Sequence, residues 1–396
     1  MKAVRQVSLI FILSVIASLG FILIWKDTVK VRGYPIGFDI YLRWAGVRAF
    51  WQGQSPYSPD VTARSDLLIY DRLRAENEIS YDFYDPAYAA IVLWPITLIP
   101  FEWAGLGWSA LGLAILLTLI VYWSWSLQPR PKPLLWGLIV FSGLLFRPAW
   151  MTILNGQYSL FLVGCAVMAW WLIVRKHDLP AGMVLAIGTI KPSILLFAPL
   201  VMALWAFRWK RWSIIWGFIG TFVIFGVISF VKIGWWIPDF LARLAEYGQM
   251  GSGQIGLSWS PGNILSPLGL LWLAQSLALL GIGLWRSSRK DEFPSLAVMA
   301  AINLNLIFSP HIVEYDLGIL LISLVWLGME WAKGRWGMMA LVILLWFPWL
   351  SWGLVLGIGG STLVWQNLVW EIFPNLILFS TLAWLMIKNK PVGIYI

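Results

Sequence analysis

The chain has 396 residues, of which 60% are hydrophobic and 12% are charged, and its formal net charge is +9. Soluble domains carry roughly a quarter charged residues, so this composition excludes a soluble enzyme. Lys and Arg outnumber Asp and Glu by 28 to 19, and in a chain this apolar the excess indicates membrane orientation rather than nucleic-acid binding. The single cysteine, Cys165, excludes an intrachain disulfide.

Long uncharged runs follow one another along the chain. The first, from about Val7 to Trp25, is preceded by Lys2 and Arg5, and it is longer than the apolar region of a cleaved signal peptide. We expect a retained anchor whose N-terminus lies in the cytoplasm. The runs do not alternate in polarity as barrel strands do. The sequence therefore predicts an all-α polytopic membrane protein of about 10–13 transmembrane helices, organised as one domain over residues 1–396.

The segment 26–86 is the most polar stretch of the chain and contains nine acidic and eight basic residues. Within it, Ile40–Trp51 has aromatic residues on one helical face and Arg43 and Arg48 elsewhere, which is typical of a helix lying in the membrane interface. Residues 87–100 are apolar but too short to cross a bilayer, so they predict a half-span. Further spans are expected near 103–126, 134–150, 158–174, 181–190, 193–207, 212–231, 263–285, 295–309, 316–332, 337–357 and 363–387.

The short basic connectors predict the orientation. With the N-terminus inside and the spans alternating, every short basic connector faces the cytoplasm, as the positive-inside rule favours. The C-terminus is then also cytoplasmic, and the long loop 26–86 and the remaining polar turns meet at the opposite face. We therefore expect a multi-pass protein of the cell (inner) membrane with an extracytoplasmic site.

Asp39 lies at this outer boundary, directly before the expected interfacial helix. One interpretation is an N-cap, since Asp accepts the free backbone donors at a helix start. The other is a general base in partly apolar surroundings. The two roles are compatible.

Lys191 stands in an apolar stretch, before Pro192, far along the chain from any other Lys or Arg. A charge inside a membrane is by default a functional hypothesis, and a phosphate held by Lys191, with Arg147, would compensate its burial. The alternative is a side chain that snorkels to a nearby surface. Near Arg147, the Asn155-Gly156-Gln157 sequence is typical of a plain turn, although Gln157 at a cavity would also bind hydroxyl groups.

The turn Ser309–Asp316 contains His311, Glu314 and Asp316. These are possible metal ligands by type, but the other histidine, His177, lies in a basic cytoplasmic connector. We expect no metal, and we expect His311 to hydrogen-bond a phosphate or to orient an acid.

Several motifs occur together in a fixed order. They are Phe38-Asp39-Ile40-Tyr41, Gly53-Gln54-Ser55-Pro56-Tyr57, Tyr84-Asp85-Pro86, Asn155-Gly156-Gln157, Lys191-Pro192 and Ser309-Pro310-His311. In this order they resemble the polyprenol-phosphate-sugar-dependent glycosyltransferases of family 87, which include mannosyltransferases. The resemblance implies a GT-C fold with interfacial helices in the first extracytoplasmic loop.

The resemblance also implies roles for single residues. It implies that Asp39 is the base and that Lys191 and His311 contact the donor or its phosphate. Where the family often has Tyr-Pro-Pro, this chain has Tyr84-Asp85-Pro86, which adds a carboxylate near the expected cavity mouth. The full set of expected site residues comprises the base Asp39, the donor contacts Lys191, Arg147, His311, Gln157 and Asn155, and the acceptor or mouth residues Tyr41, Tyr84, Asp85 and Glu314.

The resulting hypothesis is an inverting transfer of a sugar, with mannose favoured, from a polyprenyl-phosphate donor to a lipid or glycan acceptor, without a cofactor. Two alternatives remain open. A secondary transporter would also use an intramembrane lysine and broken helices, and an O-antigen ligase or polymerase would use similar lipid carriers. The absence of an internal repeat and the large first loop favour the transferase over the transporter.

Overall fold

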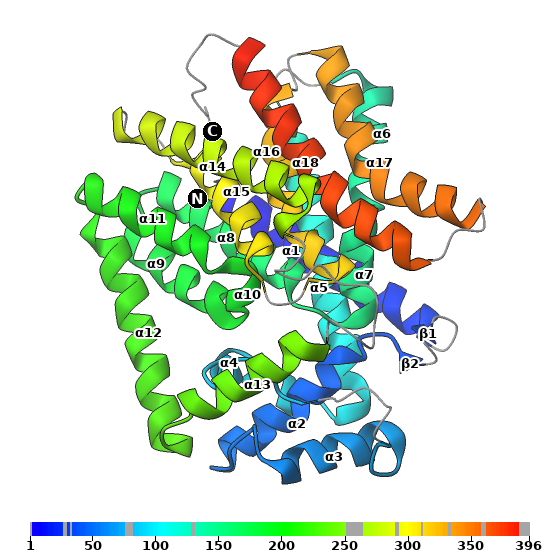
Figure 1. The fold of residues 1–396 in the computed structure, drawn as a ribbon, viewed down its shortest axis with the longest axis vertical. Helices are drawn as coiled ribbons and strands as arrows, with labels where there is room; N and C mark the ends of the chain where they lie inside the picture. The colour runs from blue at the N-terminus through cyan, green and yellow to red at the C-terminus, as the bar shows by residue number, and fades with distance from the viewer. Residues whose placement is uncertain are drawn as a thin grey trace.

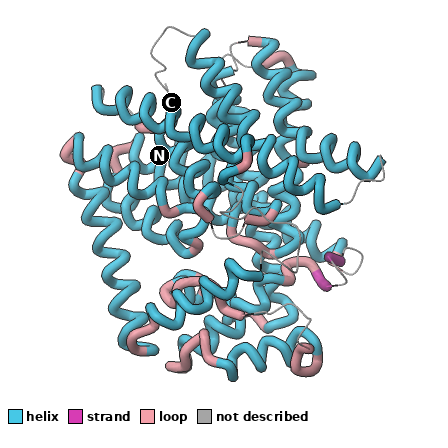
Figure 2. Tube along the Cα trace, viewed as in Figure 1, coloured by secondary structure: helices cyan, strands magenta, loops and turns pink. Residues whose placement is uncertain are grey.

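The computed structural model describes residues 2–26, 30–31, 34–75, 82–127, 131–250, 264–289, 293–309, 312–331, 334–357 and 362–387. His311, one of the expected donor contacts, lies outside these residues. The described chain is almost entirely helical (Figure 2), with one short antiparallel pair of strands, β1 (Lys30–Val31) and β2 (Tyr34–Pro35). The expected all-α fold class is confirmed.

Within the described residues, six stretches are long and apolar enough to cross a membrane. They lie in α1 (Lys2–Trp25), α5 (Phe101–Ser126), α6 with α7 (Pro133–Leu144 and Arg147–Asn155), α12 (Trp212–Ile233), α14 (Pro267–Arg289) and α17 (Arg335–Gly357). Shorter apolar helical segments pack among them, namely α8 (Ser159–Val174), α9 (Asp178–Ile187), α11 (Phe197–Arg208), α15 (Ser295–Ile307) and residues Glu371–Met386 of α18 (Thr362–Ile387). The chain is a multi-pass membrane protein.

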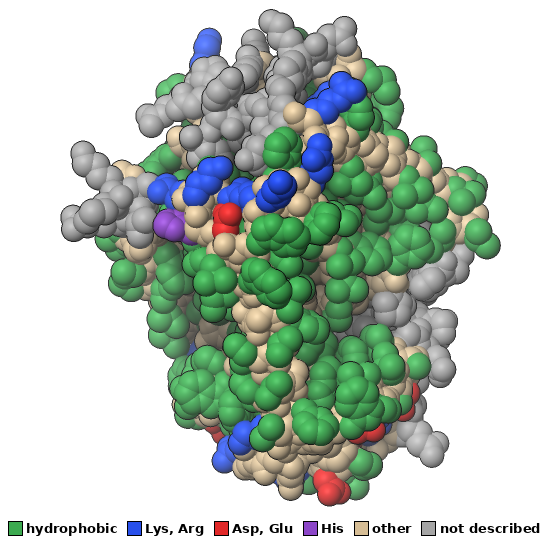
Figure 3. Space-filling model, turned by 90° about the vertical axis from the view of Figure 1, so that its left-hand side faces the viewer, with side chains coloured by type: hydrophobic (Ala, Val, Ile, Leu, Met, Phe, Trp, Pro, Cys, Tyr) green, Lys and Arg blue, Asp and Glu red, His purple; other side chains and the backbone are tan. Residues whose placement is uncertain are grey.

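The helices differ in how much of their surface meets other parts of the protein. In the apolar 18-residue stretch of each helix, only 17% is buried inside the protein for α1 and 22% for α12, against 61% for α5. Large apolar side chains such as Ile16, Trp216 and Val223 are exposed on these outer helices. Figure 3 shows apolar side chains covering the middle of one face, with Lys and Arg gathered above them. This distribution fits a belt of lipid around a central α5.

Several expected spans are broken rather than continuous. Residues 134–150 divide between α6 and α7, and 193–207 divide between α10 (Pro192–Leu195) and α11. The expected 316–332 span begins as a 3₁₀ helix, η4 (Glu314–Leu320), before α16 (Leu321–Trp331). Pro148 and Pro192 lie in the first turns of α7 and α10, where the missing N–H and fixed φ of proline suit a helix start. The first two breaks therefore coincide with prolines.

The expected half-span 87–100 is indeed short and divided. It consists of α4 (Ala89–Val92) and the 3₁₀ helix η1 (Trp94–Leu98). Together with α2 (Asp39–Trp51), α3 (Pro59–Tyr70) and α13 (Ile237–Met250), it forms the end of the molecule drawn at the bottom of Figure 1, away from the marked chain termini. The 3₁₀ segment η2 (Gly188–Ile190) joins α9 to α10.

Residues 40–51 form a helix as expected, but its two arginines do not share an exposed polar face. α2 is buried on most of its circumference, and Arg43, expected on a polar face, is only 6% exposed, whereas Arg48 is exposed. The aromatic side chains do pack as expected, since Trp44 donates to the carbonyl of Ile99 and Trp51 to that of Ala90. Arg43 can be buried on this helix because Asp85 and Gln157, from elsewhere in the chain, accept its N–H groups.

Three backbone segments meet closely at the start of α2. Gly37 has φ of +81°, and a Cβ built there would lie 2.1 Å from the carbonyl oxygen of Gly105 in α5. Gly156 has φ of +73°, and its Cβ would lie 2.6 Å from the carbonyl oxygen of Gly37. The N–H of Gly37 also donates to the carbonyl of Leu154 at 2.8 Å. Only glycine permits this approach, and it fixes α2 against α5 and α7.

We expect Gly37→Ala to destabilise the protein by about 2–4 kcal/mol, because the methyl group collides with backbone and the left-handed conformation disfavours a side chain. The thermal unfolding midpoint in detergent measures this effect. Gly20→Ala in α1 is the matched control, since nothing lies within 4 Å of its Cβ position. Equal midpoints for the two variants would contradict the close approach.

Candidate active site

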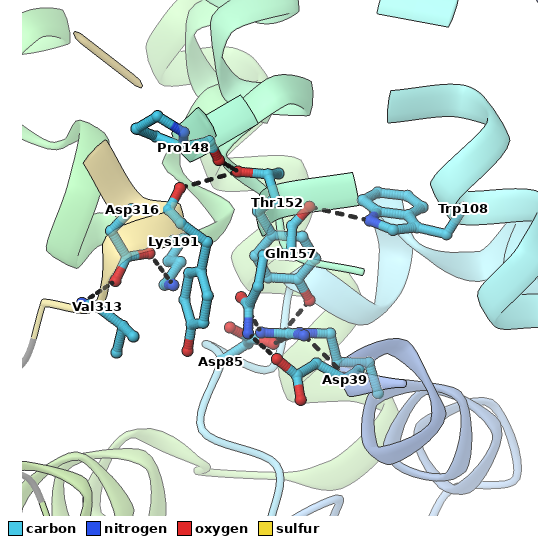
Figure 4. A network of polar contacts seen from close by, with 12 residues as sticks. Asp39, Asp85, Trp108, Pro148, Thr152, Gln157, Lys191, Val313 and Asp316 are labelled. Carbon is cyan, nitrogen blue, oxygen red and sulfur yellow. Dashed lines mark hydrogen bonds and ion pairs between the residues drawn. The ribbon is translucent and has the colours of Figure 1, made fainter. Parts of the chain in front are cut away.

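Polar side chains from distant parts of the chain gather where the start of α2, the segment before α4 and the turn between α7 and α8 meet. Figure 4 shows Asp39, Asp85 and Gln157 grouped there, with Lys191 and Asp316 a short way off. α7 links the two groups. The Thr152 hydroxyl lies 2.9 Å from the carbonyl oxygen of Tyr315 in η4, and the Thr152 carbonyl accepts the N–H of Gln157.

Asp39 is the first residue of α2, and it is partly buried. The residue in the N-cap position is Phe38, and no side chain caps the helix. The interpretation of Asp39 as an N-cap is therefore wrong. Its carboxylate instead accepts a short hydrogen bond from the side-chain N–H of Gln157. This hydrogen bond brings together two residues that the sequence analysis predicted as separate parts of the site.

Arg43 is the residue of this group that the sequence analysis missed. Its Nε donates to Asp85 Oδ2 at 3.0 Å, its Nη1 to the carbonyl of Asp39 at 2.9 Å and its Nη2 to Gln157 Oε1 at 3.2 Å. Its guanidinium lies over the ring of Tyr158, 4.1 Å from the centroid. The spacing was a usable signal, because Arg43 follows Asp39 by four residues and lies on the same helical face.

Asp85 is the buried counter-ion of Arg43, with 4% of its surface exposed. Tyr158 donates its hydroxyl to the same carboxylate at 2.7 Å, and Tyr57 donates to the Asp85 carbonyl at 2.8 Å. Burial opposes the charge on Arg43, but Tyr158, Asp85 and Asp39 outweigh it and raise the pKa of Arg43 above its ordinary value. The group thus contains two carboxylates, those of Asp39 and Asp85, and one guanidinium.

Lys191 is 8% exposed and forms an ion pair with Asp316 Oδ1 at 2.7 Å. The other oxygen of Asp316 accepts the N–H of Val313 at 3.0 Å, which fixes the start of η4. The snorkelling alternative does not describe this side chain, because its charge is met inside the bundle. An ammonium has three N–H donors, and Asp316 takes one of them.

The helix break after Lys191 is held by Asn305 of α15. Its side-chain oxygen accepts the N–H groups of Leu196 and Phe197 at 2.6 and 2.8 Å, and its NH₂ donates to the Pro192 carbonyl at 3.0 Å. Breaks at membrane depth are tolerated where backbone groups find such partners. Asn305 therefore compensates the break that places Lys191 beside η4.

Arg147 lies at the start of α7 and pairs with Glu314 of η4. Its Nη2 donates to Oε2 at 2.8 Å, and its Nε lies 2.6 Å from Oε1. Trp349 and Trp352 of α17 lie 5.0 and 4.7 Å from the guanidinium, within the range of cation–π attraction. Glu314 was expected at the cavity mouth, but it is the ion-pair partner of Arg147, which was expected to contact the donor phosphate. The segment η4 therefore supplies one carboxylate to Arg147 and one to Lys191.

The remaining expected residues lie elsewhere. Asn155 donates to the carbonyl of Met151 within its own helix. The Tyr41 hydroxyl is 3.4 Å from the carbonyl of Glu102, and the Tyr84 hydroxyl donates to Asp82. The structure therefore brings together Asp39, Asp85 and Gln157, and it pairs Lys191 and Arg147 with two carboxylates of η4. The binding roles of all these residues stay predictions.

Together these features describe a multi-pass helical bundle in which broken helices enclose carboxylates and cations. The sequence profile of Glycosyltransferase family 87 matches residues 83–310, which is more than half of the chain. The chain belongs to glycosyltransferase family 87 and is a membrane glycosyltransferase. No curated protein and no solved structure matches the chain significantly.

The matched range divides the site. Asp85, Arg147, Gln157 and Lys191 lie within it, whereas Asp39 and Arg43 precede it and η4 follows it. The resemblance drawn from the short motifs is confirmed at the level of the family.

Proposed function

We propose that this glycosyltransferase moves a sugar from a polyprenyl-phosphate donor to a hydroxyl of a lipid or glycan acceptor, with inversion at the anomeric carbon and with Asp39 as the general base. The observation that carries the proposal is the held carboxylate of Asp39, fixed by Gln157 within the same polar cluster as Arg43. A transferring hydroxyl needs such a group to accept its proton as the new bond forms.

The leaving group explains why one carboxylate is sufficient. Glycosidases use a second carboxylic acid to protonate an alkoxide leaving group, but a polyprenyl phosphate leaves as a stable anion. Its developing charge needs cations, and Lys191 and Arg147 supply them. A donor phosphate would share these cations with Asp316 and Glu314 or replace the carboxylates in their pairs. In this scheme electrostatic stabilisation comes from side chains alone, so no metal or cofactor takes part.

A lipid-linked donor also fits the architecture better than a nucleotide sugar. The connectors between α8 and α9 and between α11 and α12 comprise only residues 175–177 and 209–211. These are too short to form a nucleotide-binding domain. A donor within the bilayer reaches a site among apolar helices directly. Mannose is the sugar that the family resemblance favours and is the first to test.

The experiment uses the purified full chain in detergent with a bacterial lipid extract as acceptor. Polyprenyl-phosphate [¹⁴C]mannose should yield a new labelled glycoside, with or without EDTA, whereas GDP-[¹⁴C]mannose should yield none. Transfer from the nucleotide sugar would overturn the donor assignment. The absence of any new glycoside, together with donor uptake in proteoliposomes, would favour the transporter.

We further propose that the site faces the extracytoplasmic side of the cell membrane and that both termini are cytoplasmic. The end that contains α2, α3 and α13 lies opposite the connectors with Arg175, Lys176, Lys210 and Arg211. Basic connectors favour the cytoplasm.

Cysteine labelling in intact cells tests this orientation. Asp60 and Lys210 are exposed at opposite ends, and the native Cys165 is buried. We expect Asp60→Cys to react with a membrane-impermeant maleimide in intact cells, and Lys210→Cys to react only after permeabilisation. The reverse pattern would place the site on the cytoplasmic side.

A further inference from the structure

Gln157 connects a cation to a carboxylate through the two ends of one amide. Arg43 has only donors and an ionised Asp39 has only acceptors, so the orientation of the amide is decided by chemistry. Its oxygen must face Arg43, at 3.2 Å from Nη2, and its NH₂ must face Asp39. A flipped amide would oppose two donors on one side and two acceptors on the other.

The backbone of Gln157 is itself held in place. Its N–H donates to the carbonyl of Thr152 at 2.9 Å, and its carbonyl accepts the indole N–H of Trp108 at 3.2 Å. The preceding Gly156 lies against the backbone of Gly37, two residues before Asp39. The Gln157 side chain therefore extends from a backbone that is held in place. It reaches the carboxylate of Asp39, and the backbone just before Asp39 packs against the same turn through Gly37.

Arg43 is fixed equally well from its other side. Asp85 accepts from Nε, the Tyr158 ring covers the guanidinium and the Asp39 carbonyl accepts from Nη1. A guanidinium held at three positions presents Nη2 to Gln157 with little freedom. The chain of contacts from Asp85 through Arg43 and Gln157 to Asp39 is continuous.

The geometry points to Gln157, supported by Arg43, as the positioning residue that orients the Asp39 carboxylate for proton abstraction, rather than as a contact of the donor sugar. This inference rests on the proposed role of Asp39 as the base. Orientation of a reacting group is worth a large factor in rate, and a misplacement of about 1 Å can cost about 10²-fold. The effect of Gln157 should therefore appear in kcat and act through Asp39.

The charged and titratable groups around Asp39 determine what a substitution would do. Among the described residues they include Arg43 on α2, Asp85 before α4, and Tyr158 directly before α8, with Tyr57 behind Asp85. Gln157→Glu keeps the oxygen that faces Arg43 but opposes a second carboxylate to Asp39. Two facing carboxylates share a proton and resist losing it.

We expect Gln157→Glu to move the acidic limb of the kcat/KM–pH profile upward by about one unit or more. We also expect it to lower kcat about 10–100-fold, with the KM for the lipid donor within about twofold of wild type. Gln54→Glu is the matched control, because Gln54 is exposed in the first loop and contacts Arg64; its profile should equal that of wild type. An unshifted profile for folded Gln157→Glu, or a loss confined to the KM for the donor, would overturn the inference.

A second variant covers the case in which Gln157→Glu does not fold. Gln157→Met keeps the length of the side chain but loses both hydrogen bonds. If Gln157 acts through Asp39, adding Gln157→Met to Asp39→Asn should cause no further loss of the residual rate, because one function has already been removed. An equal additional loss in the double variant would overturn the positioning role. Full activity of Asp39→Asn alone would instead overturn the proposed base.

Discussion

Asp39→Asn is expected to lower sugar transfer by about 10²–10⁴-fold, the contribution that a general base typically makes. Asparagine has the same shape and retains an oxygen that can accept the N–H of Gln157. The fold and the position of α2 should therefore survive, while the group loses its ability to take a proton. The measurement is the initial rate of glycoside formation by purified protein at saturating donor.

Asp60→Asn is the matched control for this prediction. Asp60 lies in the first turn of α3, exposed and in the same loop as Asp39, and its substitution removes the same charge from the same part of the protein. We expect it to transfer sugar at the wild-type rate. Wild-type activity of Asp39→Asn, with an unfolding midpoint near that of wild type, would show that Asp39 is not the base.

Arg43→Leu is expected to cause the largest loss of stability, about 3–5 kcal/mol, which is the cost of breaking a buried ion pair from one side. The substitution leaves the Asp85 carboxylate buried with Tyr158 but without its cation, and it leaves the Gln157 oxygen without its donor. The unfolding midpoint in detergent should fall by many degrees. Asp85→Asn added to Arg43→Leu should recover part of the loss, because the stranded charge is then removed.

Arg48→Leu is the control that distinguishes the loss of the buried Arg43–Asp85 ion pair from a general effect of removing an arginine from α2. Arg48 lies five residues further along the same helix, is exposed, and contacts the ring of Trp44 at 5.0 Å. Exposed cation–π contacts contribute about 0.5–1 kcal/mol, so its loss should be small. A midpoint for Arg43→Leu as high as that for Arg48→Leu would contradict the buried pair.

The sequence predicted well those features that depend on local apolar pattern. The expected spans 103–126, 212–231 and 295–309 lie within about two residues of α5, α12 and α15, since a long apolar run has few alternatives to a membrane helix. The break before Pro192 was also predictable, because proline removes a backbone donor. Local pattern thus determined the class of fold and most of the helices.

Partners that are distant in sequence were beyond such patterns. Lys191 was expected to hold a phosphate or to snorkel to a surface, yet Asp316, 125 residues later, is its partner. Arg147 and Glu314 were both named as site residues, but their pairing across 167 residues has no local signature. The burial of Arg43 follows from Asp85 and Gln157 in the same way. The periodicity of a sequence shows which face of a helix is apolar. It does not show which polar residues from distant segments will pair with one another in the folded protein.

The most direct test of the central claim is the stoichiometry of a single-turnover reaction with purified protein and a radiolabelled polyprenyl-phosphate sugar. Direct transfer with Asp39 as the base predicts one equivalent of free polyprenyl phosphate for each inverted glycoside formed by the wild type, and neither product on the same timescale from Asp39→Asn. Release of polyprenyl phosphate without a glycoside, or equal glycoside formation by Asp39→Asn, would contradict it.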